Sequence, residues 1–219
     1  MPRPSSRRAQ PLSRTQVIAA ALQLADAQGI EALSMRKLAD TLGVKAMSLY
    51  NHVKNKDDLL DAIVDHVVAE MALPSLEQPW KDAMRERALS THQILLHHPW
   101  ATLPLVSRVN VGPAMLHRLE ATLACLQAAG FSLPLADHAW NAMDSHIYGF
   151  TLQALNFPFE SEDYATAAAD YVEMIPAETY PTLNQLTQLV MHRQYDGLHD
   201  FEFGLSLVLD GLETLLLRQ

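Results

Sequence analysis

Residues 38–50 read LADTLGVKAMSLY, and this stretch decides the fold. A helix-turn-helix needs a small residue in its first helix, where the second helix crosses closely, and Ala39 meets that need. The turn needs a residue that tolerates a positive φ, and Gly43 follows four positions later. Apolar contacts between the two helices are expected from Leu38, Leu42, Val44 and Leu49. The stretch therefore predicts two crossed helices that pack on a preceding helix to form a three-helix head.

Capping residues mark the helices around this stretch. Ser13 and Gln16 have the spacing of a capping box, and Gly29 is expected to end the first helix in a left-handed cap. Ser34 is the expected N-cap of the second helix, and Asn55 is the expected N-cap of a fourth. The four helices are expected over about residues 13–28, 34–42, 45–52 and 55–73.

The rest of the chain also has the pattern of helices. Strand-like alternation is absent, apolar residues recur at three and four positions, and prolines fall between the candidate segments. Residues 157–181 have the least regular pattern, which fits either a partly helical segment or a mobile one. The further helices are expected at about 80–97, 100–108, 112–129, 134–156, 182–195 and 200–218. The expected fold class is all-α, with a helix-turn-helix head on a larger helical body.

Charge is distributed unevenly along the chain. The formal net charge is −9, but residues 1–56 hold nine basic and three acidic residues, a net charge of +6. The remaining residues hold seven basic and 22 acidic residues, a net charge of −15. Such a basic head suggests that only this end approaches a polyanion, although a solubilising tail explains the charge alone equally well. Residues 1–12 are rich in Pro, Ser and Arg, and we expect a disordered basic arm.

The exposed face of the third helix is the candidate DNA-reading surface. It offers hydrogen-bonding groups, a small residue, and thioether and aromatic groups that suit thymine methyls in a major groove. Side chains near the starts of the second and fourth helices are placed to contact bases or phosphates. An ordinary helical hairpin is the alternative, but the full apolar pattern and the local positive charge favour DNA binding. The candidate DNA-binding residues are Ser34, Arg36, Lys45, Ala46, Met47, Ser48, Tyr50, Asn51, His52, Lys54 and Lys56.

Signals for an enzyme, a metal or a membrane are missing. The sequence has no Glu-x-x-His pair, no nucleophile elbow and no Gly-rich phosphate loop, and its ten histidines include no pair at i, i+4. We therefore expect no catalytic residue, no metal and no cofactor. The one cysteine, Cys125, is expected to be buried. No apolar h-region follows the basic start of the chain, so we expect no secretory signal, and no 18-residue apolar run is free of charge. These features favour a cytoplasmic protein.

Two parts of the chain resemble the tetracycline-repressor (TetR) family. In the head the resemblance is carried by residues 29–39, 42–44 and 49–60, which read GIEALSMRKLA, LGV and LYNHVKNKDDLL. In the body, residues 129–133, 201–205 and 209–213 are similar to the tetracycline repressor's own subfamily.

The resemblance implies an all-helical homodimer with about nine or ten helices per subunit. Two heads would bind successive major grooves of a near-palindromic operator, and a small molecule bound in each body would spread the heads and release the DNA. Residues 13–55 would then be the helix-turn-helix domain, and residues 56–219 the ligand-binding and dimerisation domain.

The chain also departs from the tetracycline repressor. Asn51 stands where that repressor has a tryptophan and Met47 where it has a proline, so we expect a different operator. The stretch that matches the repressor's metal-ligating histidine reads ATLPLV at residues 101–106, and Gln153 replaces an acidic partner. The expected effector is therefore not a tetracycline–magnesium complex but a more apolar molecule.

Two further sets of residues are candidates for the body's functions. The pocket is expected to be lined by aromatic, histidine and other apolar side chains, although plain core packing explains them equally well; these are Trp100, Leu103, Trp140, Met143, His146 and Phe150. The apolar segments 134–156 and 200–218, with the small Gly204 and Gly211, favour a dimer interface over packing within one subunit. The candidate interface residues are Leu152, Phe203, Leu207, Leu209 and Gly211.

The expected function is that of a ligand-responsive transcriptional repressor. Its expected partners are a double-stranded DNA operator, an unknown small-molecule effector and a second copy of the chain. An activator and a ligand-independent DNA-binding regulator of the same fold are the alternatives.

Overall fold

The described residues of this computed structural model are 12–158, 163–195 and 200–218, and they form eleven α-helices and no strand. This confirms the all-α fold class. The helix beyond the ten placed from the sequence is α9, in the segment left open between helix and mobile chain. None of the described helices is long and apolar enough to cross a membrane. The helices are α1 (Arg14–Gln28), α2 (Met35–Leu42), α3 (Ala46–Leu49), α4 (Lys56–Glu70), α5 (Trp80–His97), α6 (Thr102–Ser107), α7 (Pro113–Ala128), α8 (Leu133–Leu155), α9 (Tyr164–Tyr171), α10 (Pro181–Met191) and α11 (Phe201–Leu216).

The predicted caps start the helices of the head. Ser13 Oγ accepts the amide of Gln16 at 3.2 Å, and the Gln16 side chain accepts the amide of Ser13 at 2.9 Å, so the capping box is confirmed. Ser34 Oγ accepts the amide of Lys37 at 3.2 Å at the start of α2. The side chain of Asn55 caps α4 in the same way. Each cap satisfies an amide that has no partner within its helix.

Gly43 makes the turn between α2 and α3. Its φ of 66° and ψ of 30° lie in the left-handed helical region, as the sequence predicts. Gly29 also has a positive φ, 78°, but its ψ of 161° is extended, so the left-handed cap expected there is wrong in detail. Helix α3 is shorter than expected, because the amides of Asn51 and His52 bond carbonyls three residues back and the chain continues as turns.

The head core continues into the body. Leu38 and Leu49 are fully buried against α1, and Leu59 and Ile63 of α4 belong to the same cluster. Leu12 packs on this cluster too, so it belongs to the head, whereas residues 1–11 of the expected arm lie outside the described residues. The cluster also includes residues of α6 and of the 3₁₀ turn before it, so head and body share one packed surface.

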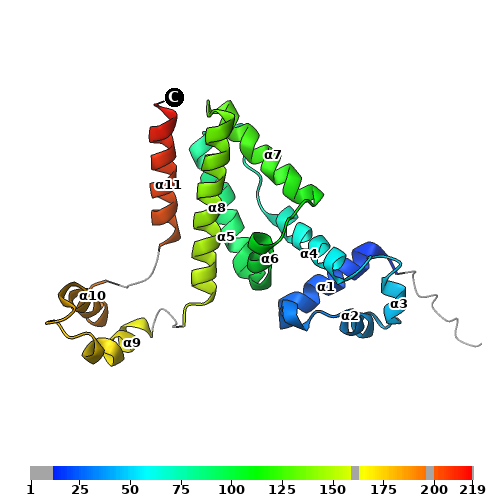
Figure 1. Ribbon diagram of the computed structural model, residues 1–219, viewed down its shortest axis with the longest axis horizontal. Helices are drawn as coiled ribbons and strands as arrows, with labels where there is room; N and C mark the ends of the chain where they lie inside the picture. The colour runs from blue at the N-terminus through cyan, green and yellow to red at the C-terminus, as the bar shows by residue number, and fades with distance from the viewer. Residues whose placement is uncertain (1–11, 159–162, 196–199, 219) are drawn as a thin grey trace, which may run out of the picture.

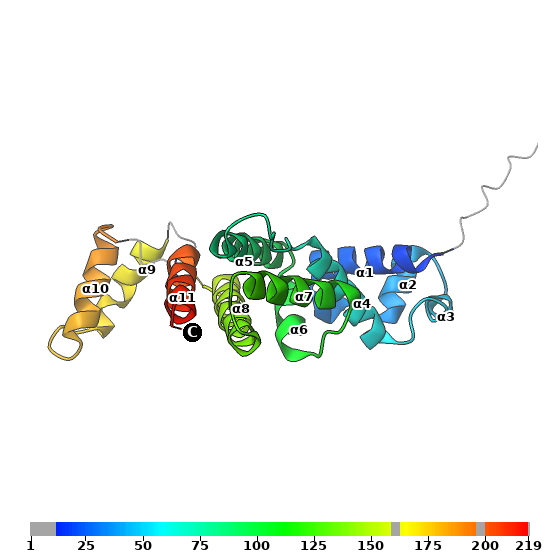
Figure 2. The same ribbon diagram turned by 90° about the horizontal axis from the view of Figure 1, so that it is seen from above.

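The body is a stack of long helices with a projecting arm. Helices α5, α7, α8 and α11 surround a second apolar cluster, which contains Cys125 as expected. Lys81 of α5 pairs with Asp210 and Glu213 of α11 at 2.6 and 2.8 Å. Helices α9 and α10 pack on each other and lie at one end of the molecule in both views (Figure 1, Figure 2). The head lies at the opposite end of the molecule from this arm.

Replacing Gly43 by alanine tests the turn. An L-residue in the left-handed region is strained, so we expect Gly43→Ala to lower the free energy of unfolding by about 1 kcal/mol, although a Cβ there would meet no atom within 4 Å. Urea denaturation of the full chain measures the change. The control Thr41→Ala, on the exposed face of α2, should stay within about 0.5 kcal/mol of wild type. An unchanged stability of Gly43→Ala would contradict this account of the turn.

Candidate nucleic-acid interface and helical body

The short helix α3 exposes most of its predicted reading surface. Met47 is 75% exposed and Tyr50 is 45% exposed, whereas Leu49 between them is fully buried. Lys45 and Asn51 are also exposed at the ends of this surface. Because Leu49 fixes the helix on the head core, the exposed side chains project from a rigid support.

The other predicted contact residues lie around this surface and differ in their exposure to solvent. The side chains of Arg36, Lys54 and Lys56 are exposed. Ala46, Ser48 and His52 are half-buried, and Ala46 packs on the head core. Ser34 is exposed but its hydroxyl already caps α2.

The start of α4 is braced from α1. Arg14 Nη1 donates to the carbonyl oxygen of His52 at 3.0 Å and lies 3.7 Å from Asp58 Oδ2. Asp58 in turn accepts the amide of Lys54 at 2.8 Å. Arg14 therefore positions the segment between α3 and α4, a role that the sequence reading did not assign to it.

Helix α4 joins the head to the body through its carboxylates. Arg108, which follows α6, donates to Asp61 at 2.8 Å and to Asp57 at 3.3 Å. Asp65 accepts the amides of Ala114 and Met115 at 3.3 and 3.0 Å and so caps the start of α7. A displacement of α4 would break these bonds or carry α6 and α7 with it.

A second joint lies at the other end of α4. His98 is 3% exposed, with its Nδ1 2.7 Å from Asp26 Oδ1 of α1 and its Nε2 3.3 Å from Glu70 Oε2 of α4. Trp100 Nε1 donates to the same Asp26 oxygen at 2.7 Å. The structure thus places Trp100, an expected pocket residue, in the joint between head and body.

The other expected pocket residues have different environments. Leu103 is 62% exposed on α6, and Met143 is fully buried in the body core. His146 and Phe150 pack around Phe201, and His146 Nε2 lies 3.0 Å from the Phe201 carbonyl oxygen. Of the six expected pocket residues, His146 and Phe150 thus share an aromatic cluster, and Phe150 also packs against the core cluster that contains Met143.

His92 completes that aromatic cluster. Its ring stacks on Phe201 with 4.4 Å between centroids, and its Nδ1 lies 2.8 Å from Thr151 Oγ1. Burial, and secondarily the nearby His146, lower the pKa of His92, so its neutral form is favoured. Sequence reasoning did not assign His92 to this site.

Two openings in the described surface lie elsewhere. A cleft of about 500 Å³ separates α1 and α4 from the loop before α7, and its lining includes Arg14, Asp61, Asp65 and His66. A groove of about 390 Å³ runs between α9 and α10, lined largely by apolar and tyrosine side chains. None of the expected pocket residues lines either opening.

Three charged residues of the body core were not among the candidates from the sequence. Arg87 of α5, Arg118 of α7 and Asp144 of α8 are at most 9% exposed. Each has buried neighbours on the same face of its helix, three or four residues away: Ala83, Met84 and Thr91 for Arg87, Thr122 for Arg118 and Ile147 for Asp144. A charge within an apolar stripe is the sequence signal that could have found them. Trp140, an expected pocket residue, donates to Asp144 Oδ2 at 2.7 Å and so belongs to this group.

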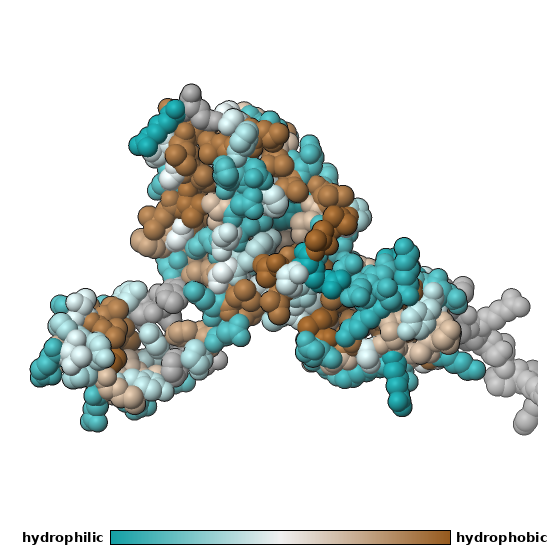
Figure 3. All heavy atoms as spheres, viewed as in Figure 1, coloured by the Kyte–Doolittle hydropathy of each residue, from teal (hydrophilic) through white to brown (hydrophobic). Residues whose placement is uncertain are grey.

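The candidate dimer residues lie on two sides of the C-terminal helices. Phe203 and Leu207 are 66% and 60% exposed, Gly211 is exposed, and Leu152 is half-buried. Leu209 is fully buried in the subunit's own core, so the structure corrects its expected place at an interface. Apolar side chains gather over α11 and the neighbouring body, while the head is largely hydrophilic (Figure 3).

No group of three or more His, Cys, Asp or Glu side chains that could hold a metal ion occurs within residues 12–158, 163–195 and 200–218.

The chain matches known proteins over both of its parts. Residues 17–63 match the model for bacterial regulatory proteins of the tetR family, and residues 73–216 match the tetracyclin repressor-like C-terminal domain. An HTH-type transcriptional regulator of Saccharopolyspora erythraea is 39% identical over 149 residues, which span 68% of this chain and 63% of that regulator. Tetracycline repressor protein class D of Escherichia coli is 34% identical, over 94% of this chain and 91% of the repressor.

A solved structure shares this architecture. ActR of Streptomyces coelicolor in complex with actinorhodin has a TM-score of 0.78 and 29% sequence identity, covering 92% of this chain and 95% of the ActR chain.

The exposed Tyr50 offers a test of the reading surface. We expect Tyr50→Ala to weaken binding to duplex DNA that carries the chain's preferred site by about 1–3 kcal/mol without unfolding the head, because the side chain is outside the core. Fluorescence anisotropy and circular dichroism measure the two effects. Tyr180→Ala, which removes a comparably exposed tyrosine near α10, is the control and should bind DNA as wild type does. Wild-type affinity of Tyr50→Ala would remove this residue from the interface.

Proposed function

Because the chain belongs to the TetR family of bacterial regulators, we propose that it is a ligand-responsive repressor that binds a near-palindromic operator as a homodimer. A small-molecule effector in the body releases the DNA. The family consists of transcriptional regulators, so the expectation that the chain is not an enzyme is confirmed. The observation that carries the proposal is the exposed face of α3, held on a head that α4 joins to the body.

Charge supports DNA binding by the head alone. The net charge of +6 over residues 1–56 attracts phosphates, while the net charge of −15 over the rest repels them. In this proposal the side chains of Met47, Tyr50 and Asn51 face the major groove. Arg36, Lys45, Ser48, His52, Lys54 and Lys56 add base and phosphate contacts from the same side of the head.

The uncovered face of α11 supports the homodimer. Phe203, Leu207 and Gly211 recur at four-residue spacing and leave an apolar stripe exposed on this helix. Helices that expose such a stripe in one subunit bury it in a symmetric contact. Two heads held by that contact would meet two half-sites, which is why we propose a near-palindromic operator.

The joints of α4 support release by an effector. Asp61, Asp65 and Glu70 connect this helix to α6, α7 and His98, so a rearrangement of the body reaches the head through it. ActR has been crystallised with actinorhodin and with (S)-DNPA, which favours a small-molecule effector here. We assign DNA binding to residues 13–55 and effector binding and dimerisation to residues 56–219.

The effector is proposed to differ from a tetracycline–magnesium complex. Residues 101–106, at the start of α6, contain no histidine, and Gln153 of α8 carries no negative charge. The histidine and the acidic side chain that hold the metal in the tetracycline repressor are therefore replaced by uncharged groups without an imidazole or a carboxylate, which would hold magnesium less tightly.

Selection from random duplexes tests operator binding. We expect the full chain to enrich one motif with two inverted half-sites about one helical turn apart. Binding to it should weaken steeply between low and physiological salt, because the protein displaces counterions from the phosphates. Enrichment of no motif, or of one without two-fold symmetry, would contradict the proposal.

A charge in the α11 stripe tests the dimer. We expect Leu207→Glu to raise the dissociation constant of the dimer at least about thirtyfold, because the carboxylate would be desolvated in the contact. Sedimentation equilibrium gives that constant, and operator affinity should fall with it. Leu116→Glu, at an exposed leucine of α7, is the matched control and should remain dimeric. A Leu207→Glu variant that stays dimeric would rule out this face.

A further inference from the structure

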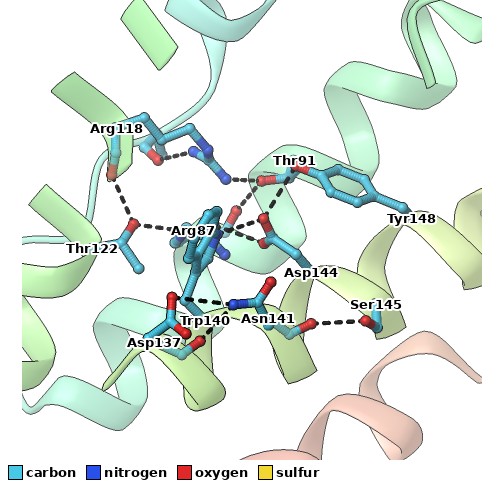
Figure 4. A network of polar contacts seen from close by, with 11 residues as sticks. Arg87, Thr91, Arg118, Thr122, Asp137, Trp140, Asn141, Asp144, Ser145 and Tyr148 are labelled. Atoms are coloured by element: carbon cyan, nitrogen blue, oxygen red, sulfur yellow. Dashed lines mark hydrogen bonds and ion pairs between the residues drawn. The ribbon is translucent and has the colours of Figure 1, made fainter. Parts of the chain in front are cut away.

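The buried charges of the body form one connected cluster. Arg87 Nη2 donates to Asp144 Oδ1 at 2.7 Å, and Arg87 Nε donates to Thr122 Oγ1 at 3.0 Å (Figure 4). Arg118 donates to Thr91 Oγ1, whose own hydroxyl donates to the Arg87 carbonyl oxygen. Three helices, α5, α7 and α8, thus direct charged groups to a single place in the interior.

The cluster carries more positive than negative charge. Asp144 is the one carboxylate paired with either arginine in the part of the chain that the structure describes. Tyr148 donates to Asp144 Oδ2 at 3.3 Å, and burial, aided by that carboxylate, raises the pKa of Tyr148, so the phenol is neutral. Burial and the neighbouring Arg87 lower the pKa of Arg118 to about 10, which leaves it protonated at neutral pH. Two guanidinium groups therefore face one carboxylate.

One donor of the cluster has no partner. Arg87 is 1% exposed, and its Nη1 has no hydrogen bond within the described residues. An isolated buried donor of a charged group costs several times more than a neutral hydrogen bond contributes. A protein keeps such an atom where something else supplies the acceptor. Both the missing acceptor and the missing negative charge would be supplied by one anionic group.

We propose that the effector is an organic anion whose carboxylate or acidic phenolate pairs with Arg87 inside the body. The regulatory part of this inference rests on the proposed function, whereas binding of the anion at Arg87 does not. The fully buried Met84, Met143 and Ile147 belong to the apolar core of the same body, so the rest of the ligand is apolar. The effector is thus an apolar molecule, as the sequence predicts, that also carries an acidic group.

The cluster lies near the surface on one side and near α4 on another. Trp140, which donates to Asp144, is half-buried, so a ligand would reach the cluster past this side chain. Arg118 Nη1 donates at 2.9 Å to the carbonyl oxygen of Ala72, two residues beyond the end of α4. An anion bound beside Arg87 would also attract the Arg118 guanidinium. It would thereby alter the hydrogen bond from Arg118 to the Ala72 carbonyl oxygen.

Matched acids and amides test the charge of the ligand. Isothermal titration calorimetry of the full chain would use aromatic carboxylates of increasing ring number, each paired with its primary amide. We expect at least one acid to bind about tenfold or more tightly than its amide. Arg87→Gln should remove that preference. Arg85→Gln, two residues away on another face of α5 and half-exposed beside Ser206, is the control and should keep it.

A second variant covers the case in which Arg87→Gln does not fold. Asp144→Asn leaves both arginines without their carboxylate, so it should increase the preference for the acid about tenfold. The proposal is overturned if no acid binds, if amides bind as tightly as acids, or if the preference persists in Arg87→Gln or falls in Asp144→Asn.

Operator release separates this proposal from the proposed function. If an acid binds at Arg87 but leaves the protein on its operator, the anion site stands and effector-driven release fails. If uncharged compounds release the DNA and acids show no preference, release stands and the anion site fails.

Discussion

The capping of α7 by Asp65 is the contact on which the rest of the structure depends. Helix α7 has no side-chain cap of its own, since Gly112 precedes it, and its first amides bond instead to a carboxylate of α4. A Cβ at Gly112 would overlap with the Asp65 carboxylate, so only glycine allows this approach. Because α4 also starts a few residues after α3, this one helix fixes the position of the head relative to the body.

Through the contacts of α4, a change in the body would reach the head over a short distance. The buried Arg118 holds the Ala72 carbonyl just beyond α4, and Arg108 holds Asp61 within it. A coupling of about 1–3 kcal/mol, typical between two sites, is comparable with the strength of one buried hydrogen bond to a charged group, such as the bond from Arg118. In the proposed repressor, rearranging a few bonds at these joints would be enough to change operator affinity.

The head was more predictable than the body's site. Ser34 and Gly43 act on backbone groups within a few residues, so their roles could be read locally and were confirmed. Exposure along α3 followed from the same helical period, with Leu49 inward and Met47 outward. Trp100 and Met143 could not be assigned this way, because an aromatic or apolar residue looks the same whether it lines a pocket or fills a core.

The sequence alone determined ten of the eleven described helices, the N-caps at Ser13, Ser34 and Asn55, the Gly43 turn and the separation of charge between head and body, because each of these depends on neighbours along the chain. Tertiary structure alone decided which faces meet. It buried Leu209 within its own subunit and brought Arg87, Arg118 and Asp144 together from three helices. The positive charge of that interior comes from residues that are far apart in the sequence. Only the packing of the three helices brings these residues together.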